Sequence, residues 1–596
     1  MNKDFLETKS GVVECALSCG GTELPSSTIV LSADVEYRIN GIPKATIVLL
    51  DGDMNEGKFE LCEGKSLKPG MEVELKVGYS AKEKSTVFSG IIVRLGVCAF
   101  QKGKSCTKIE CRHKAISLTK SRRNVNYLNK SDDDIVNEIA SNSSITIESS
   151  MNGVTHKELL QYYCTDWDFI MTRAETNGCW LIPTLEKITI KPIEVNESNN
   201  ITLIWKKNFL EFNATIDAEH QVKNVEARAW DPTKQEIISG KSAQQSIQQQ
   251  GNINSKELSN ALSVPDNILQ INSCIEKQAL DKWSKAEQIK NELSRVYGSI
   301  KCSGTSEIEL GKLLNLDYVG NRFSGKAIVS NVSHHMELGR WTTTICFGMK
   351  KEWYVEKFNT MAPAASGYNC GITGLLTGVV IQTHDDPDNL NRVKVKIPLM
   401  QNEQEGVWAR LGTPYASDGV GGLFFPEKDD EVILGFFNGD PSSPVILGSL
   451  YSSKRQVPQK LKQENNIKQL LTREKLSVLF DEEKKSITIM TPGERKVSLD
   501  DDGKKITLED SSGNKIELSD SGIKIDSPKD ITINTKGKFN VEAKGGIAFK
   551  SATNLNAEGL DIEFKAKNGF KAQGTTTAEV SASLNTIIKG GLVKIN

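Results

Sequence analysis

Residues 506–549 read ITLEDSSGNKIELSDSGIKIDSPKDITINTKGKFNVEAKGGIAF, and this stretch decides the fold of the last part of the chain. Each unit opens with a short strand in which apolar and polar residues alternate. It closes with Gly, Asn, Asp, Ser or Lys, which form corners. The strand starts recur about every eight residues, which is typical of a β-solenoid or β-helix. The predicted strands are residues 506–508, 516–518, 523–525, 531–533, 539–541 and 547–549.

The repeat over residues 476–596 predicts a needle built by three chains. Alternation with a period of two buries one face of a strand, but each strand here offers only two or three apolar side chains. Three chains wrapped about one axis pair every strand with a neighbour and leave no open edge. A monomeric solenoid is the alternative, although its coils usually hold about twenty residues or more. We therefore predict a C-terminal triple-stranded β-helix in a homotrimer.

The composition is that of a globular chain without a polyanionic partner. A length of 596 residues predicts about four domains. The net charge of −2 gives no reason to expect nucleic acid or an anionic surface as a lasting partner. The opening residues, MNKDFLETKSG, lack the apolar segment of a Sec signal. We expect a cytoplasmic protein during assembly, whose export would need another machine.

Motifs that could carry catalysis or hold a cofactor are weak. Residues 320–326 read GNRFSGK, but Ala327 stands where a phosphate-binding loop needs Ser or Thr, so a hairpin turn is the better interpretation. The 12 cysteines are interpreted as reduced and mostly buried. Cys106, Cys111 and His113 form a Cys/His cluster whose spacing is unlike that of a zinc site. We expect no catalytic residue, no cofactor and no metal.

The order of strand-like and helix-like segments predicts a mainly β chain with some α. Residues 131–140 and 165–177 predict helices opened by a capping Ser or Thr, and residues 280–295 predict a third. Residues 376–451 show short strands with tight turns, which fits an OB-fold barrel. Residues 241–260, rich in Ser, Gln and Asn, predict a mobile insertion. The expected domains are a first hub β-barrel (1–123), an α/β hub insert (124–200), a second hub β-barrel with a helical and polar insertion (201–360), a linker (361–375), the OB-fold domain (376–451), a second linker (452–475) and the trimeric needle (476–596).

The sequence resembles the spike protein of the type VI secretion system, the VgrG family, and within it the Bacteroidetes branch. NRVKV at 391–395 stands where the family has Gly-Arg-Val-x-Val, with Asn391 in place of the usual Gly. VWAR at 407–410 matches the family's Trp-Ala-Arg, and TDWDF at 165–169 resembles its hub helix. The further matching strings are FP at 425–426, DEV at 430–432, FNGDP at 437–441 and PVILGS at 444–449. With the terminal repeats, the resemblance covers nearly the whole chain.

The resemblance implies a non-catalytic, membrane-puncturing spike of a contractile injection machine. Its implied partners are two further copies of the chain, an Hcp-like hexameric tube, baseplate proteins, effector proteins and a PAAR-repeat protein at the tip, with injection into target cells. The structural residues carried over in the OB segment are Arg392, Trp408, Arg410, Pro426, Glu431, Gly439, Asp440 and Pro441. Those carried over in the hub helix are Asp166, Trp167, Phe169 and Arg173. The expected tip-binding residues are Leu592, Val593, Lys594, Ile595 and Asn596.

Two other functions remain open from the sequence. A phage or extracellular contractile-particle spike has the same physical design. A cell-wall hydrolase hub is disfavoured, because residues 452–475 are too few for a catalytic domain between the OB segment and the needle.

Overall fold

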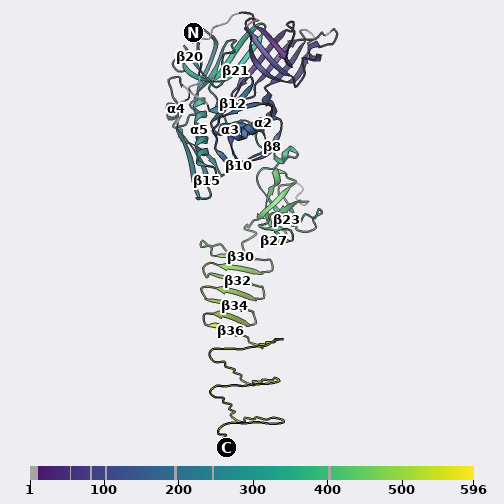
Figure 1. Ribbon diagram of the computed structural model, residues 1–596, viewed down its shortest axis with the longest axis vertical. Coiled ribbons are helices and arrows are strands. Elements are labelled where there is room, and N and C mark those ends of the chain that lie inside the picture. The colour runs from purple at the N-terminus through teal and green to yellow at the C-terminus, as the bar shows by residue number, and fades with distance from the viewer. Residues whose placement is uncertain are drawn as a thin grey trace. The chain divides into compact units, whose positions relative to one another are not determined.

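The computed structural model describes residues 11–595 except 54, 81–82, 101–103, 193–197, 244–246, 248 and 401–404, and only the backbone of residue 200. The chain divides into two compact units, Met1–Leu450 and Tyr451–Asn596, which are described separately (Figure 1). Over the ranges just given, no helix is both long enough and apolar enough to cross a membrane.

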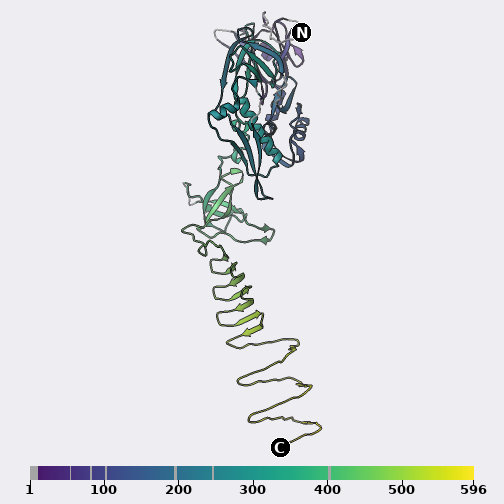
Figure 2. The same cartoon turned by 90° about the vertical axis from the view of Figure 1, so that its left-hand side faces the viewer.

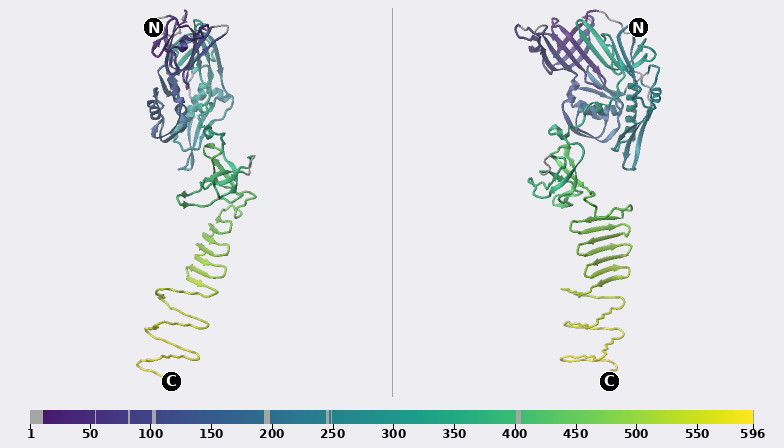
Figure 3. Two further views of the ribbon diagram at one scale, coloured as in Figure 1. Left: turned by 90° about the vertical axis from the view of Figure 1, so that its right-hand side faces the viewer. Right: turned by 180° about the vertical axis from the view of Figure 1, so that it is seen from behind.

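The first unit opens with a β-rich hub whose two halves share one 14-stranded sheet. Strand β3 of the first half pairs antiparallel with β21 of the second half, with Val35 opposite His334. Each half keeps a core of its own, one around Phe88 and one around Phe347. Figure 3 shows the purple first half beside the teal second half. The predicted tandem barrels are therefore two β-rich halves with separate cores, joined through their strands.

The first half consists of β1 (Glu14–Cys19), β2 (Thr22–Glu23), β3 (Val30–Arg38), β4 (Lys44–Leu50), α1 (Glu60–Glu63), β5 (Glu72–Gly78), β6 (Ser85–Cys98) and β7 (Cys106–Arg112). The second half consists of β13 (Ser198–Ile204), β14 (Phe209–Ile216), β17 (Gln249–Gln250), β19 (Val296–Ser303), β20 (Leu313–Asp317), β21 (Gly325–Glu337) and β22 (Arg340–Phe347).

The α/β insert confirms the two helices predicted between the halves. Ser131 opens α2 through a capping box with Asp134. The Thr165 hydroxyl opens α3 by accepting the Asp168 backbone N–H at 3.1 Å, and Gly178 follows the helix with φ +69°. The insert consists of η1 (Lys114–Thr119), β8 (Arg122–Ser131), α2 (Asp132–Ser141), β9 (Thr146–Ser149), β10 (Thr155–Thr165), α3 (Asp166–Thr176), β11 (Cys179–Pro183) and β12 (Lys187–Pro192).

The polar stretch 241–260 was wrongly predicted to be a mobile insertion, as far as its described residues go. It contains β17 and α4, and the Arg295 guanidinium donates to the carbonyls of Gln250 at 3.0 Å and Ile253 at 2.7 Å. Residues 244–246 and 248 lie outside the described part. The third predicted helix is confirmed as α5. This region consists of β15 (Asn224–Asp231), β16 (Glu236–Ala243), α4 (Ser255–Ala261), β18 (Asn267–Ile271) and α5 (Lys277–Ser294), and α6 (Tyr354–Lys357) and η2 (Ala364–Gly367) follow the hub.

The last part of the first unit is a closed five-stranded barrel in the order β23-β24-β25-β29-β28, as predicted for residues 376–451. Its core is aliphatic, with Val380, Val395 and Leu434 fully buried. The barrel consists of β23 (Leu376–Gln382), β24 (Val393–Lys396), β25 (Val407–Leu411), β28 (Glu431–Phe436), η3 (Phe437–Gly439) and β29 (Pro444–Ser449), and β26 (Ala416–Ser417) and β27 (Val420–Gly421) form a separate hairpin.

The second unit begins as an antiparallel meander of seven strands, each paired with the next along the chain (Figure 1). Its first strand, β30, lies inside the predicted linker 452–475, so that linker is shorter than expected. The predicted strands 506–508, 516–518 and 523–525 are confirmed within this meander, but the period of about eight residues is too short for it, because four consecutive strands begin at Ser486, Lys496, Lys505 and Lys515. The strands are β30 (Ile467–Leu471), β31 (Ser477–Asp481), β32 (Ser486–Met490), β33 (Lys496–Asp500), β34 (Lys505–Glu509), β35 (Lys515–Ser519) and β36 (Gly522–Asp526).

Candidate trimer interface

The meander separates apolar from polar side chains on its two faces. In β33, Leu499 points to one face and its neighbour Ser498 to the other. The cross-strand register places Leu499 opposite both Ile487 and Ile506. The same register continues along the meander and gives two rows of apolar side chains on one side, here called the apolar face. The apolar face consists of Val478, Phe480, Ile487, Ile489, Val497, Leu499, Ile506, Leu508, Ile516, Leu518, Ile523 and Ile525.

The apolar face lies open to water in the single chain. Leu499 is 42% exposed and Ile523 is 73% exposed, whereas Thr507 on the polar face is only 5% exposed. In a domain that folds alone the apolar side chains are the buried ones, whereas here the apolar face has the larger exposed fractions. A contiguous apolar surface of this kind marks a protein contact. Three copies that turn this face toward one axis would bury it completely.

Residues 527–595 carry a related signal with a different period. Ile531, Phe539 and Ile547 follow one another at steps of eight residues, and each is at least 50% exposed. Across the described part of this segment no strand is assigned, so the strands predicted to begin at these residues are not formed by one chain. Figure 2 shows why, since the turns of this segment lie farther apart than the strands of the meander. The backbone groups therefore have no partner strand within the chain.

The predicted tip residues lie at the end of this segment. Leu592 is 76% exposed, Val593 47% and Ile595 86%, and Lys594 is also exposed. Asn596 lies outside the described residues. The described tip residues thus present apolar side chains without a partner in the chain.

In the OB barrel, the predicted Arg392 and Trp408 lie together around a carboxylate that the sequence did not single out. The Arg392 Nε donates to both oxygens of Asp386 at 3.1 Å, and its Nη2 donates to Oδ1 at 2.6 Å. The guanidinium carbon lies 5.9 Å from the centre of the Trp408 ring. The Arg392 hydrogen bonds hold the pKa of Asp386 well below its usual range. An Arg directly before a strand and after an Asp-rich turn was the available signal for this pair.

The other predicted OB residues hold turns and strand ends. Gly439 has φ +70° and accepts the Ile372 backbone N–H at 2.8 Å. The Asp440 side chain accepts from the Ser442 N–H at 3.0 Å. The remaining predicted residues are Pro426 (buried), Glu431 (half-buried, at the start of β28), Pro441 (half-buried) and Arg410 (exposed, on β25).

In the hub, all four predicted residues lie on α3. Trp167 and Phe169 are buried in the insert's core. Asp166 pairs with Arg123 at 3.1 Å. Arg173 binds Asp132 on α2, whose side chain is fully buried, through Nε at 2.6 Å and Nη2 at 3.2 Å. Asp132 escaped the sequence analysis, because an acid in a first helical turn looks like a simple dipole partner.

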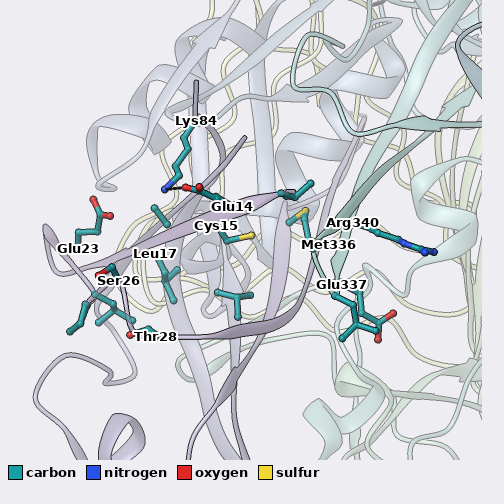
Figure 4. A pocket seen from close by; sticks show the side chains of 17 residues that line it. Glu14, Cys15, Leu17, Glu23, Ser26, Thr28, Lys84, Met336, Glu337 and Arg340 are labelled. Atoms are coloured by element: carbon teal, nitrogen blue, oxygen red, sulfur yellow. Dashed lines mark ion pairs between the residues drawn. The ribbon is translucent and has the colours of Figure 1, made fainter. Parts of the chain in front are cut away.

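A hollow of about 300 Å³ lies beside β1 and the β21–β22 turn (Figure 4). Glu14 is paired with Lys84 at 3.1 Å. Burial raises the pKa of the Cys15 thiol to about 11, so the thiol is protonated at neutral pH and a poor nucleophile. Elsewhere, Asp217, Glu219 and His220 lie close enough to share an ion, but His220 Nδ1 is already 2.7 Å from Asp217. Neither group forms a catalytic arrangement.

Models of three known protein families match successive parts of the chain. A family model described as the Alg8 N-terminal domain matches residues 9–337, more than half of the chain. The chain belongs to this family. A second model, the type VI secretion system/phage-baseplate injector OB domain, matches residues 376–451. A third, the phage baseplate V C-terminal trimerisation domain, matches residues 486–550 and therefore includes most of the apolar face.

Curated relatives of this chain carry the VgrG name. The type VI secretion system spike protein VgrG3 of Vibrio cholerae is 36% identical over 75 residues, which are 12% of this chain and 7% of that protein. VgrG1a of Pseudomonas aeruginosa is 31% identical over 97 residues, 15% of each protein. The matched part is thus a small fraction of these relatives' length. Together with the OB and trimerisation matches, these relatives confirm the predicted resemblance to the VgrG family.

One solved structure to which the chain is similar comes from Escherichia coli. It is described as a component of the type VI secretion system that resembles the T4 bacteriophage tail proteins gp27 and gp5. It is 15% identical, covers 73% of this chain and 99% of its own, and aligns with a TM-score of 0.37.

Proposed function

We propose that three copies of this chain form the membrane-puncturing spike of a contractile injection machine of the type VI secretion kind. The observation that carries the proposal is the apolar face, which a lone chain leaves in water. Three chains closed about one axis bury the apolar face. They also leave no open strand edge in residues 527–595, here called the lower segment. The match of residues 486–550 to a trimerisation domain supports this arrangement. A closed β shaft of this kind resists buckling under a contractile push.

The mass of the purified full chain in solution tests this proposal. Sedimentation equilibrium or light scattering at micromolar protein should give three chains per particle. A well-folded lone chain under the same conditions would overturn the proposal, since the shaft could not then be a shared structure.

The hub is the part proposed to meet the Hcp-like tube and the baseplate. Each chain contributes two β-rich halves joined through β3 and β21, so three chains would offer six similar elements to a hexameric ring. Co-sedimentation of the trimer with preformed Hcp-like rings should be lost when the hub is deleted and kept when residues 592–596 are deleted. Equal binding by both deletions would contradict this assignment.

The far end of the shaft is proposed to bind a PAAR-repeat protein through residues 592–596. The support is the exposed Leu592 and Ile595 side chains, which three chains would place together. Replacement of Leu592 by Asp should abolish binding of the cognate PAAR protein, whereas replacement of the exposed Lys571 by Asp should not. Effector proteins would travel with this assembly, which forms in the cytoplasm and is then injected into target cells.

Two alternatives are separated by experiment. A phage or extracellular contractile-particle spike would have the same trimeric mass but would assemble with a different tube and sheath. Catalysis is not part of the proposal, because the one described thiol in the β1 hollow is held protonated by burial. A cell-wall turbidity assay with the pure trimer should stay flat, and lysis would revive the hydrolase alternative.

A further inference from the structure

Two cysteines face one another across the β6–β7 hairpin of the hub. The register of these antiparallel strands places Cys98 directly opposite Cys106. One residue of each strand separates this pair from Gly96 and Lys108, and the next pair on the same face, Arg94 and Glu110, is joined at 2.9 Å. Side chains that are directly opposite in an antiparallel pair point to the same side of the sheet. The two sulfurs therefore share one face at the end of the ladder.

The spacing of such a pair suits a disulfide. Directly opposite residues of antiparallel strands have Cα atoms about 4.5–5.5 Å apart, and disulfides need roughly 4.4–6.8 Å. The backbone therefore needs no large movement for a bond to form. Burial is the largest cause that raises the pKa of Cys106, and the neighbouring Cys98 thiol raises it further.

Other cysteines in the hub strands lack such a partner. Cys111, on the opposite side of β7 from Cys106, faces Ala45 and Ile92. The Cys302 sulfur lies 3.4 Å from the carbonyl oxygen of Thr343, the residue opposite it. In the structure all 12 cysteines are free thiols. The Cys98–Cys106 pair thus differs from Cys111 and Cys302 because the strand register places another cysteine directly opposite.

We propose that Cys98 and Cys106 are a thiol–disulfide switch that closes when the protein meets a small disulfide such as oxidised glutathione. The half-buried Cys98 attacks the reagent as its thiolate, forms a mixed disulfide and releases one glutathione thiol. Cys106 then loses its proton and attacks the Cys98 sulfur, which forms the intramolecular disulfide and releases the second glutathione thiol. Two protein thiols are oxidised and one glutathione disulfide is reduced. The pairing does not depend on the proposed function of the chain.

The oxidation state of the Cys98–Cys106 pair would therefore depend on whether the surrounding compartment is reducing or oxidising. In a reducing cytoplasm the pair stays open, and in an oxidising space the bond closes the short loop between β6 and β7.

The test uses the full-length chain with the exposed Cys274 and Cys370 replaced by Ser, so that links between chains do not interfere. After incubation with oxidised glutathione, intact-mass measurement should show the loss of two hydrogen masses per chain. Digestion should release the Cys98 and Cys106 peptides as one linked species that separates on reduction. Cys302→Ser should behave as the parent, and Cys98→Ser should lose the linked species.

The outcome also decides between pairing and simple modification. A stable glutathione adduct on Cys98 without the linked peptide, or no reaction at all, would overturn the proposal. A linked peptide that joins Cys98 to a different cysteine would do so as well.

Discussion

The replacement Leu499→Asp puts a carboxylate on the apolar face and tests whether that face is shared between chains. Leu499 is 42% exposed in the single chain and lies opposite Ile487 and Ile506. In a lone chain the new carboxylate would keep access to water, and the meander's own hydrogen bonds would be unaffected. In a trimer the same position faces the axis, and three carboxylates would enter an apolar interior.

The expected loss can be estimated from these exposed fractions. Full burial of a Leu side chain contributes about 1.5–3 kcal/mol, so the remaining 42% contributes roughly 1 kcal/mol per chain on association. An unpaired buried carboxylate adds several kcal/mol per chain. Over three chains the penalty is on the order of 10 kcal/mol, or about seven powers of ten in the association constant.

The matched control is Ser498→Asp, one residue away and on the other face. Ser498 lies opposite Thr488 and Thr507 on the polar face, so its carboxylate should stay outside the apolar interior in every assembly state. Sedimentation equilibrium across a protein and urea dilution series measures the difference. Leu499→Asp should dissociate at far lower urea than the parent, whereas Ser498→Asp should follow the parent. Identical dissociation curves for the two variants would refute the reasoning.

Three further predictions concern the first unit. Gly439→Ala places a Cβ about 2.9 Å from the Ile372 carbonyl at φ +70° and should lower barrel stability by roughly 1–3 kcal/mol in chemical unfolding, whereas Gly448→Ala, with open space around it, should be nearly neutral. Arg173→Leu leaves the fully buried Asp132 without its main cation and should destabilise the hub by about 3–5 kcal/mol, seen as a lower unfolding temperature. Burial lowers the pKa of His334 to about 4, so the hub should lose stability as pH falls from about 6.5 toward 4, by up to roughly 3 kcal/mol from this residue; His334→Gln should reduce that slope.

The sequence predicted the parts of this chain whose signals are local. The capping Ser131 and Thr165 marked two helices at their correct starts, since a cap is a contact between residues three apart. The OB barrel was predicted from its turns and from strings that its family shares. By contrast, Asp132 was missed because the arginine that binds it, Arg173, lies 41 residues away, and no local pattern joins the two. Asp386 lies only six residues from Arg392, so a local signal for that pair existed and was read only as a turn.

The wrong period in the meander has a physical reason. The hairpins between its strands are made by residues in the left-handed conformation, and several of these are not glycine. Lys485, Glu494 and Lys504 have φ of 48°, 59° and 47°. Two of these turns, TPGE at 491–494 and DDGK at 501–504, also contain the Gly that a sequence reader expects at a turn, so the turns were recognisable and only the spacing was misjudged. The prediction applied the eight-residue spacing of residues 531–547 to the meander, where consecutive strands from Ser486 to Lys515 begin nine or ten residues apart.

The meander and the lower segment of the second unit need neighbouring chains for different reasons. In the meander, each strand finds its hydrogen bonds within the chain, so only apolar contact remains to be made with other copies. In the described residues after Asp526, no backbone–backbone hydrogen bond is formed within the chain, and unpaired buried N–H and C=O groups are strongly unfavourable. The lower segment therefore needs neighbouring chains for both its backbone and its side chains, whereas the meander can exist before they meet. Assembly should accordingly begin at the preformed apolar faces and continue downward, because the faces bring three lower segments together at high effective concentration.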